Sequence, residues 1–262
     1  MKIAIIGAGA MGGAIAEGLI KGTYIDNENI TVSDPSAEAR KHFADLGITA
    51  TPSNQLAAQG ADVVCVVVKP WLVEQVLTGL RDVLDYEQQK LVVVAAGVKS
   101  ESICQWLAKD ERMIPLFLCI PNIAIAQLQS MTFLVPSVGT QPQHTEQVKA
   151  LFDSMGQTLL TDEQHLAAGT TLASCGIAYA MRYIRAASEG GVELGFKADE
   201  AKQVVMQTMR GAVELLQATG MHPEQAIDLV TTPGGLTIRG LNEMEHAGFT
   251  SSVIRGLKAG AK

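Results

Sequence analysis

The chain has 262 residues, of which 47% are hydrophobic and 18% are charged, and its formal net charge is −7. This length favours two domains with large buried cores. The negative charge argues against nucleic acid or an anionic membrane as a partner, because both attract clusters of Lys and Arg. The sequence also lacks a signal-peptide pattern and an apolar run of membrane-spanning length, so we expect a cytoplasmic protein.

Short β-branched runs alternate with helical stretches in the first 160 residues. The patterns predict strands at 2–6, 30–33, 63–68, 91–94, 113–119 and 131–135, and helices at 10–20, 36–46, 71–80, 100–109 and 141–155. The predicted strands are apolar without strict alternation, which is typical of parallel strands that are covered on both faces. We therefore expect residues 1–160 to form a doubly wound α/β domain.

Strand signals stop after about residue 160. Ala-rich segments predict helices at about 165–190, 198–219, 234–247 and 249–259, with breaks at Gly190–Gly191, Gly220 and Pro233. The first of these helices is so rich in apolar and small residues that packing against another subunit is a reasonable hypothesis, although a core within one chain would give the same pattern. We expect residues 161–262 to form an all-α domain.

A glycine-rich segment follows the first predicted strand and opens the first predicted helix. It has the form G-x-G-x-x-G and consists of Gly7, Ala8, Gly9, Ala10, Met11 and Gly12. In a Rossmann-like domain the first glycine permits a tight turn, the second leaves room for a pyrophosphate, and the third lets the helix pack on the strand. An ordinary turn could hold the same glycines, but their setting favours a nicotinamide-dinucleotide site.

Asp34 ends the second predicted strand, where an acidic side chain commonly binds the ribose hydroxyls of NAD. Ser33, Ser36 and Arg40 could instead surround the extra phosphate of NADP. An Asp-Pro turn, in which Asp34 or Ser36 caps the next helix, explains the same residues without a ligand. The sequence therefore leaves the choice between NADP(H) and NAD(H) open.

Two further predicted strands end near the same crevice, because ligands bind at the carboxyl ends of such sheets. These ends supply candidates for the nicotinamide side of the site, namely Val67, Val68, Lys69, Pro70, Ala95, Ala96 and Gly97. Lys69 fits equally well as a solvated lysine at a strand end.

A second candidate site lies at the start of the predicted helix near residue 234. Thr232 fits the N-cap, Pro233 fits the first helical position, and Gly234 and Gly235 would expose backbone N–H groups to an anion. A capped helix without a ligand would give the same pattern. The segment therefore predicts a helix start that is able to bind a carboxylate.

The cysteines stand singly in apolar segments, at positions 65, 104, 119 and 175. They lack the close pairing of a zinc or redox site, so we expect buried small hydrophobic residues and no bound metal.

These motifs occur in a characteristic order along nearly the whole chain. The order comprises the turn over 7–12, Thr51-Pro52 with Asn54, Val68-Lys69-Pro70, Ala95-Ala96-Gly97-Val98, and Thr232-Pro233-Gly234-Gly235-Leu236-Thr237-Ile238, followed by Glu243, Gly248 and Phe249. In this order the chain resembles pyrroline-5-carboxylate reductases, which make L-proline by hydride transfer to a cyclic imine. The segment over 232–238 is the most specific part of the resemblance.

The resemblance implies an NAD(P)H-dependent oxidoreductase of proline biosynthesis that acts on a C=N bond. It implies a Rossmann-like domain over 1–160, in which Asn54 contacts the cofactor. It also implies a helical dimerisation domain over 161–262, so that the enzyme is a homodimer or a larger homo-oligomer. Backbone amides of Gly235 and Leu236 would hold the substrate carboxylate, and the hydroxyl of Thr237 would face the ring nitrogen as the catalytic group. Asp228, Thr232 and Gly234 would complete the substrate site.

The chain departs from the family pattern in two places. Residues 174–179 read Ser-Cys-Gly-Ile-Ala-Tyr where relatives read Gly-Ser-Gly-Pro-Ala-Tyr, and residues 120–124 keep Pro121-Asn122 without the following Thr-Pro or the preceding arginine. Both departures fall near the pocket that the resemblance implies. They leave the fold assignment unchanged and bear on substrate size and turnover.

Two other functions use the same domain plan. A β-hydroxyacid-dehydrogenase-like reductase would need an acid or base for an alcohol, but Lys197 and Lys202 are isolated, and His165 and His222 lack a pairing group in the sequence. A non-catalytic dinucleotide-binding dimer would have no evident need for the anion-binding helix start. Both remain as alternatives, and imine reduction fits the motifs better.

Overall fold

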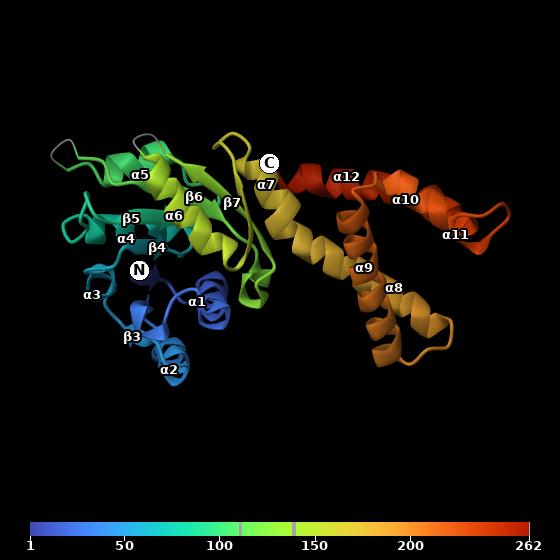
Figure 1. The fold of residues 1–262 in the computed structure, drawn as a ribbon, viewed down its shortest axis with the longest axis horizontal. Helices are drawn as coiled ribbons and strands as arrows, with labels where there is room; N and C mark the ends of the chain where they lie inside the picture. Colours follow the sequence, from blue (N-terminus) through green and yellow to red (C-terminus); the bar gives the residue numbers. More distant parts are fainter. Residues whose placement is uncertain (110–111, 138–139, 262) are drawn as a thin grey trace. The chain divides into compact units, whose positions relative to one another are not determined.

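The computed structural model describes residues 1–109, 112–137 and 140–261; Lys262, the last residue of the predicted helical domain, lies outside this range. The chain divides into two compact units, 1–177 and 178–260. The first unit is an α/β structure, drawn from blue to yellow in Figure 1, and the second consists of helices. The predicted fold class, a Rossmann-like α/β domain followed by an all-α domain, is confirmed.

One sheet organises the first unit. In the described residues it has eight strands in the order β3-β2-β1-β4-β5-β6-β7-β8, and every neighbouring pair is parallel except β6 and β7. The chain order reverses between β1 and β4, which makes their carboxyl ends the expected ligand site. The strands are β1 Ile3–Ile6, β2 Ile30–Ser33, β3 Thr49–Thr51, β4 Val63–Val66, β5 Lys90–Val93, β6 Leu116–Ile120, β7 Ser130–Pro136 and β8 Gly156–Leu160.

Helices cover both faces of the sheet. Alternate residues of β1 belong to different cores: Ile3 and Ile5 pack with Phe43 in one, and Ala4 and Ile6 pack in the other. Because both faces are buried, the strands are continuously apolar. The helical segments of this unit are α1 Ala10–Gly22, η1 Asn27–Asn29, α2 Ala37–Asp45, α3 Asn54–Ala58, η2 Pro70–Leu72, α4 Val73–Leu80, α5 Ser100–Trp106, η3 Ile123–Gln127, α6 Pro142–Asp153, α7 Leu166–Gly169 and the π-helical η4 Thr170–Cys175.

Two strands of the sheet were missed by the sequence patterns. In β3 the residues are exposed or half-buried, and β8 exposes both Leu159 and Leu160, so neither strand shows the continuous apolar run that marks the central strands. Edge positions explain β3, which pairs with β2 alone, and β8, which pairs with β7 alone. A pattern based on two buried faces does not detect a strand with open edges and little buried surface.

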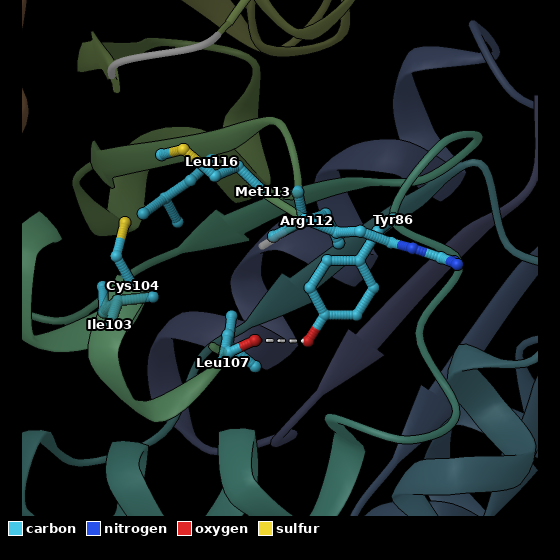
Figure 2. A pocket seen from close by; sticks show the side chains of 8 residues that line it. Tyr86, Ile103, Cys104, Leu107, Arg112, Met113 and Leu116 are labelled. Atoms are coloured by element: carbon cyan, nitrogen blue, oxygen red, sulfur yellow. Dashed lines mark hydrogen bonds between the residues drawn. The ribbon is translucent and has the colours of Figure 1, made fainter. Parts of the chain in front are cut away.

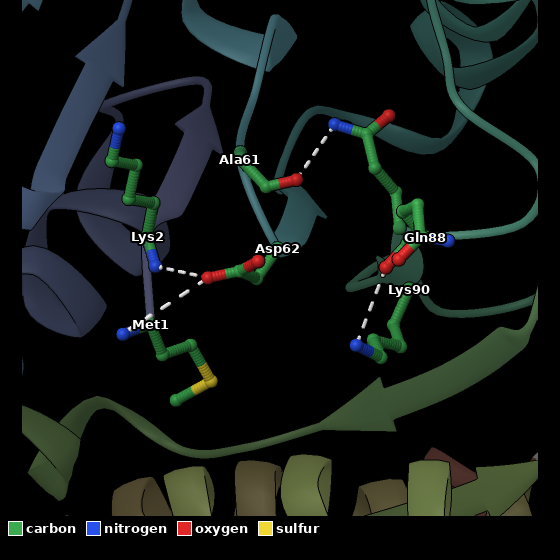
Figure 3. Close-up of polar contacts among 7 residues, drawn as sticks. Met1, Lys2, Ala61, Asp62, Gln88 and Lys90 are labelled. Atoms are coloured by element: carbon green, nitrogen blue, oxygen red, sulfur yellow. Dashed lines mark hydrogen bonds and ion pairs between the residues drawn. The ribbon is translucent and has the colours of Figure 1, made fainter.

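Polar contacts at the amino ends of the strands fix the opposite edge of the sheet (Figure 3). The Asp62 carboxylate accepts the backbone N–H of Lys2 at 2.7 Å and lies 4.0 Å from the Met1 amino group. The buried Gln89 amide donates to the carbonyl oxygens of Ala58 and Ala61, each at 2.7 Å. These contacts satisfy backbone groups just before β1 and in the turn that leads into β4.

The second unit contains five helices among its described residues, namely α8 Gly176–Glu193, α9 Ala198–Thr219, α10 Pro223–Val230, α11 Leu236–His246 and α12 Phe249–Gly260. The predicted break at Gly190–Gly191 is wrong, because α8 continues through both glycines. A Cβ on Gly191 would lie 2.9 Å from that of Ala201, so the missing side chain lets α9 approach α8. The predicted break at Gly220 is confirmed by its left-handed φ of 64°.

None of the helices in the described ranges is long and apolar enough to span a membrane.

Candidate active site

The three motif glycines adopt the geometry of a dinucleotide turn at the end of β1. Gly7 has a φ of +101°, donates its N–H to the Ser33 carbonyl at 2.7 Å, and would place a Cβ 2.4 Å from the Val67 carbonyl oxygen. A Cβ on Gly12 would lie 1.9 Å from the Gly7 carbonyl oxygen, which explains how closely α1 packs on the turn. A Cβ on Gly9 would meet no atom within 4 Å. The turn is therefore tight at its two ends and open at its middle.

Asp34 fastens this turn to the end of β2. One carboxylate oxygen accepts the N–H of Ala8 at 2.7 Å, and the other accepts the N–H of Ser36 at 2.8 Å. Ser36 caps α2 by accepting the N–H of Ala39 at 3.2 Å. Arg40 donates from one guanidinium nitrogen to the carbonyl oxygens of Asp34 and Pro35, each at 2.8 Å. The interpretation of this segment as an Asp-Pro turn with a capped helix is thus correct. Asp34 also lines the large cleft described next, so this structural role does not exclude a contact with the cofactor.

A cleft of about 850 Å³ lies at the carboxyl ends of β1, β2, β4 and β5. Its size is within the usual range for ligand sites. Predicted cofactor residues that line it are Gly7, Gly9, Ala10, Met11, Ser33, Asp34, Asn54, Val67, Val68, Lys69, Pro70, Ala95 and Ala96. Ala8, Gly12 and Gly97 do not line it: Ala8 bonds to Asp34, Gly12 is buried under the turn, and Gly97 lies beyond the end of β5.

Several lining residues were not predicted from the sequence. Gln75, Val76 and Gly79 lie on α4, and Ile123 begins η3. The remaining additions are Ile6, Pro35, Pro52, Gln55, Leu72 and Val94, of which Pro52 appeared only within the family motif. Gln75, Val76 and Gly79 lie on one face of α4, but the sequence alone does not predict which face of that helix borders the cleft.

The altered segment at 120–124 contributes to the same cleft through Ile123, whose side chain is 49% exposed. Asn122 is buried and caps η3 by accepting the N–H of Ala124 at 3.0 Å. Its amide nitrogen also donates to the carbonyl oxygen of Ala173 at 3.4 Å. Ala173 belongs to η4, which ends within the altered segment 174–179. The hydrogen bond therefore links the neighbourhoods of the two segments that depart from the family pattern.

The helix start in the second unit differs from its predicted form. The predicted N-cap at Thr232 and first helical residue at Pro233 are wrong, because α11 begins at Leu236 and its N-cap is Gly235. The Gly235 N–H donates to the Thr232 carbonyl at 2.9 Å, and Gly234 has a φ of +70°. Pro and Gly at the second and third positions form a type II turn before the helix. Both patterns use Thr, Pro and Gly, which explains the misplaced boundary.

This turn changes which amides are free to bind an anion. The Gly235 N–H is already used within the turn, whereas the N–H groups of Leu236 and Thr237 belong to the first turn of α11, where no helical acceptor precedes them. Leu236 is 85% exposed. Asp228 shapes the preceding chain through its backbone, since its carbonyl accepts the N–H and the hydroxyl of Thr231, each at 3.3 Å. Its carboxylate is not part of these contacts.

The side chains considered as alternative acids or bases have structural contacts. The expectation that His165 lacks a pairing group is wrong, because its Nδ1 lies 2.8 Å from the carboxylate of Asp162 and both side chains are exposed. His222 caps α10 by accepting the N–H of Glu224 at 3.3 Å. Lys202 lies 3.2 Å from Asp199 on the surface of α9. Lys197 is the N-cap residue of α9 and is exposed. These are contacts of helix ends and surfaces.

The predicted burial of the cysteines is correct for Cys65 and Cys119 and wrong for Cys104 and Cys175, which are half-buried. Burial raises the pKa of the Cys65 thiol to about 12. A thiol with such a pKa stays protonated at neutral pH and is a poor nucleophile or metal ligand. A group of His, Cys, Asp or Glu residues able to hold a metal is absent from the described residues.

A second pocket in the first unit is too small for a substrate (Figure 2). It lies between α5 and β6, has a volume of about 20 Å³, and is bordered by Tyr86, whose hydroxyl donates to the Leu107 carbonyl at 2.7 Å. A space of this size holds about one water molecule. The cleft at the switch point is the candidate cofactor site of this unit, because the glycine turn and the ends of β2, β4 and β5 line it.

Comparison with known proteins finds matches in both parts of the chain. A family model described as pyrroline-5-carboxylate reductase dimerisation matches residues 163–262, and one described as NADP oxidoreductase, coenzyme F420-dependent, matches residues 2–97. Pyrroline-5-carboxylate reductase from Pisum sativum is 33% identical over 99% of this chain and 93% of its own length. The chain belongs to the pyrroline-5-carboxylate reductase family. The family prediction is confirmed.

Other members of the family extend the comparison. Pyrroline-5-carboxylate reductase 1 from Dictyostelium discoideum is 35% identical over 97% of this chain, which spans 48% of that relative's length. The structure of 1-pyrroline-5-carboxylate reductase from Streptococcus pyogenes has a TM-score of 0.87 and 31% identity, and covers 100% of this chain and 96% of its own. An NADP-bound pyrroline carboxylate reductase structure from Plasmodium falciparum has a TM-score of 0.90 at 23% identity, with 100% and 95% of the two chains covered, and shows the shared fold.

Proposed function

We propose that this chain reduces pyrroline-5-carboxylate to L-proline with NADPH or NADH, as an oxidoreductase acting on a C=N bond in proline biosynthesis. The observation that carries the proposal is the similarity, over nearly the full chain, to reductases of this name at 32–35% identity. The cleft at the switch point and the exposed start of α11 give the activity a cofactor site and a separate anion-binding segment.

The fit of a dinucleotide to the cleft is supported by the open position at Gly9. Because a Cβ there would meet no atom within 4 Å, the backbone is accessible to a phosphate group at the start of α1. Asp34 and Asn54 line the cleft at the end of β2, and Lys69 and Ala95 line it at the ends of β4 and β5. When bound, the nicotinamide supplies the hydride. The chain's own residues hold the cofactor and exclude water.

The substrate side is assigned to the segment from Thr232 to Thr237. The N–H groups of Leu236 and Thr237 bind the substrate carboxylate at the start of α11, and the type II turn over 232–235 holds them in place. A Cβ on Gly235 would lie 2.6 Å from the Thr232 hydroxyl oxygen and 3.0 Å from its carbonyl oxygen, so a side chain there would crowd the turn. Asp228 completes the segment through its backbone carbonyl.

Thr237 is the proposed catalytic residue. A protonated imine is already an electrophile, so catalysis requires orientation and a hydrogen-bonding partner for the ring nitrogen rather than a covalent nucleophile. The hydroxyl of Thr237 lies in the first turn of α11, one residue beyond the amide of Leu236, which would bind the carboxylate. It orients the nitrogen and holds the proton there.

The proposed assembly is a homodimer or a larger homo-oligomer, with residues 161–262 as the dimerisation domain. A dimerisation-domain match over 163–262 supports this assignment. The cytoplasmic location and the absence of nucleic-acid and membrane partners stay predictions from the sequence.

The reductase activity is tested by mixing purified protein with pyrroline-5-carboxylate and following the absorbance of NADPH, and separately of NADH. We expect substrate-dependent oxidation of at least one cofactor. Thr237→Ala should lower kcat/KM about 10- to 100-fold, the range for losing a hydrogen bond to a charged group. Thr237→Ser keeps the hydroxyl and should retain most of the activity.

Two results would count against this proposal. Oxidation that does not depend on the imine, or none at saturating substrate, would contradict the reductase activity. Equal activity of Thr237→Ala and the unaltered protein would contradict the role of the hydroxyl and leave the overall activity in place.

A further inference from the structure

Glu163 holds the start of a distant helix. Its carboxylate accepts the backbone N–H of Ser100 at 3.1 Å and, through its other oxygen, the Ser100 hydroxyl. The N-cap residue of α5, Lys99, makes no side-chain cap of its own. Glu163 therefore supplies, from 63 residues further along the chain, the cap that α5 lacks locally.

The loop that this contact fastens borders the cofactor cleft. Val94, Ala95 and Ala96, at the end of β5, line the cleft, and Ser100 follows four residues after Ala96. Gly97 has a φ of +79° and space around it, so the loop itself offers little packing at that position. Val98 packs against the core, and the bond to Glu163 adds a polar constraint on the backbone between the cleft wall and α5.

The segment that carries Glu163 also contacts a second loop of the cleft. Ten residues after Glu163, the carbonyl oxygen of Ala173 accepts the bond from Asn122, which caps η3 next to Ile123 of the cleft wall. Between these two points Gly169 lies against the ring of Phe133 on β7, where a Cβ would be 2.8 Å from the ring. The segment over 163–173 is therefore packed on the sheet and bonded to two loops of the cleft.

We propose that Glu163 is a positioning residue of the reductase, which sets the backbone of the 94–100 loop and so the nicotinamide end of the bound dinucleotide. The proposal rests on the proposed function for its catalytic consequence. It acts through Ser100 and touches neither cofactor nor substrate. A mobile loop would reduce the fraction of protein with a formed cleft wall and would weaken both cofactor binding and hydride-transfer geometry.

Hydrogen exchange in the free protein tests the first step. Glu163→Gln keeps the size of the side chain and removes its charge, so the two bonds from Ser100 are weakened. We expect the amides of residues 97–101 to exchange about tenfold faster, while the amides of β1 and β4 are unchanged. Ser100→Ala should produce a smaller increase, and Ser100→Thr, which keeps both donors, should match the unaltered protein.

Cofactor binding and kinetics test the second step. The dissociation constant of NADPH, measured by titrating its fluorescence, should rise about threefold or more in Glu163→Gln. The value of kcat should fall as well, while the KM for the imine changes less than twofold. Glu101→Gln, at the same end of α5, is the matched control and should leave binding and kcat unchanged.

A cap that serves only stability would lower the melting temperature and leave NADPH binding, kcat and exchange at 97–101 unaltered, and that result would overturn the proposal. If Glu163→Gln does not fold, the comparison of Ser100→Ala with Ser100→Thr gives the same decision. Absence of imine reduction by the unaltered protein would refute the proposed function alone, because exchange and NADPH binding do not require the reaction. Equal exchange and equal NADPH binding in all variants would refute the role of Glu163.

Discussion

Single atoms decide the shape of the cofactor turn. Gly7 and Gly12 are needed for packing, because a methyl group on either would collide with backbone oxygen, at 2.4 Å and 1.9 Å. Gly9 has a φ of −68°, which any residue adopts, and free space around its missing side chain. The fold therefore does not require a glycine at position 9, and a bound phosphate does.

This difference predicts opposite effects for two similar substitutions. Gly9→Ala should fold with a melting temperature close to that of the unaltered protein, and should bind NADPH at least about tenfold more weakly, because the methyl group occupies the space of the pyrophosphate. Gly12→Ala should destabilise the protein by about 1–3 kcal/mol, as overpacking does. Thermal melts and NADPH titrations of both variants check the prediction. Unchanged NADPH affinity in Gly9→Ala would contradict the assigned phosphate position.

Turns between elements position the second candidate site. The type II turn over 232–235 lies between α10 and α11, and Gly234 has the positive φ that the third position of this turn requires. The amides of Leu236 and Thr237 depend on this turn for their direction. The turn thus links a conformational requirement at one residue with the proposed binding of the carboxylate.

Gly234→Ala should strain this turn and disturb the substrate side alone. We expect the KM for pyrroline-5-carboxylate to rise about fivefold or more, because an alanine at φ +70° costs about 1 kcal/mol or more. The dissociation constant of NADPH should be unchanged, since the cofactor turn lies in the other unit. Gly240→Ala, inside α11 with open space around it, is the control and should leave both constants unaltered. If NADPH affinity fell as well, the substitution would be disturbing the fold as a whole, which would contradict a local effect on the substrate side.

The second unit lacks the buried core that the first unit has. Among residues 178–260 of the single chain, Ala201 alone is a buried hydrophobic residue. Many large apolar side chains of this unit are exposed, among them Met181, Leu194, Val204, Met206, Val213 and Ile254. Extensive exposed apolar surface of this kind is typical of a protein interface. The match to a dimerisation domain agrees with that interpretation.

Light scattering after size exclusion should therefore give a mass of at least twice the 27.8 kDa of one chain. Val204→Glu places a charge on the exposed apolar surface of α9 and should shift the protein toward the monomer, because burying an unpaired charge at an interface is unfavourable. Gln217→Glu adds the same charge at an exposed polar position on a different face of the same helix and is the control. A monomeric unaltered protein would refute the predicted oligomer.

The sequence by itself determined the class of the fold, the central strands and the order of the motifs. The strands β1, β2, β4 and β5 were predicted to within two residues at each end, because burial on both faces requires continuous apolar runs that are visible without a structure. The glycine turn over 7–12 could also be predicted from the sequence, because the steric requirement at each glycine position is local to the turn. The family followed from motifs that are also local.

Tertiary structure decided which side chains meet. The bonds that Asp34 accepts from Ala8 and that Glu163 accepts from Ser100 join residues 26 and 63 positions apart, and no local pattern specifies either pair. The lining face of α4 and the edge strands β3 and β8 likewise depend on packing against distant elements. Local steric requirements and burial depend on residues that are neighbours in the sequence, so they can be predicted from it. Contacts between distant segments depend on how the whole chain folds, so only the tertiary structure shows them.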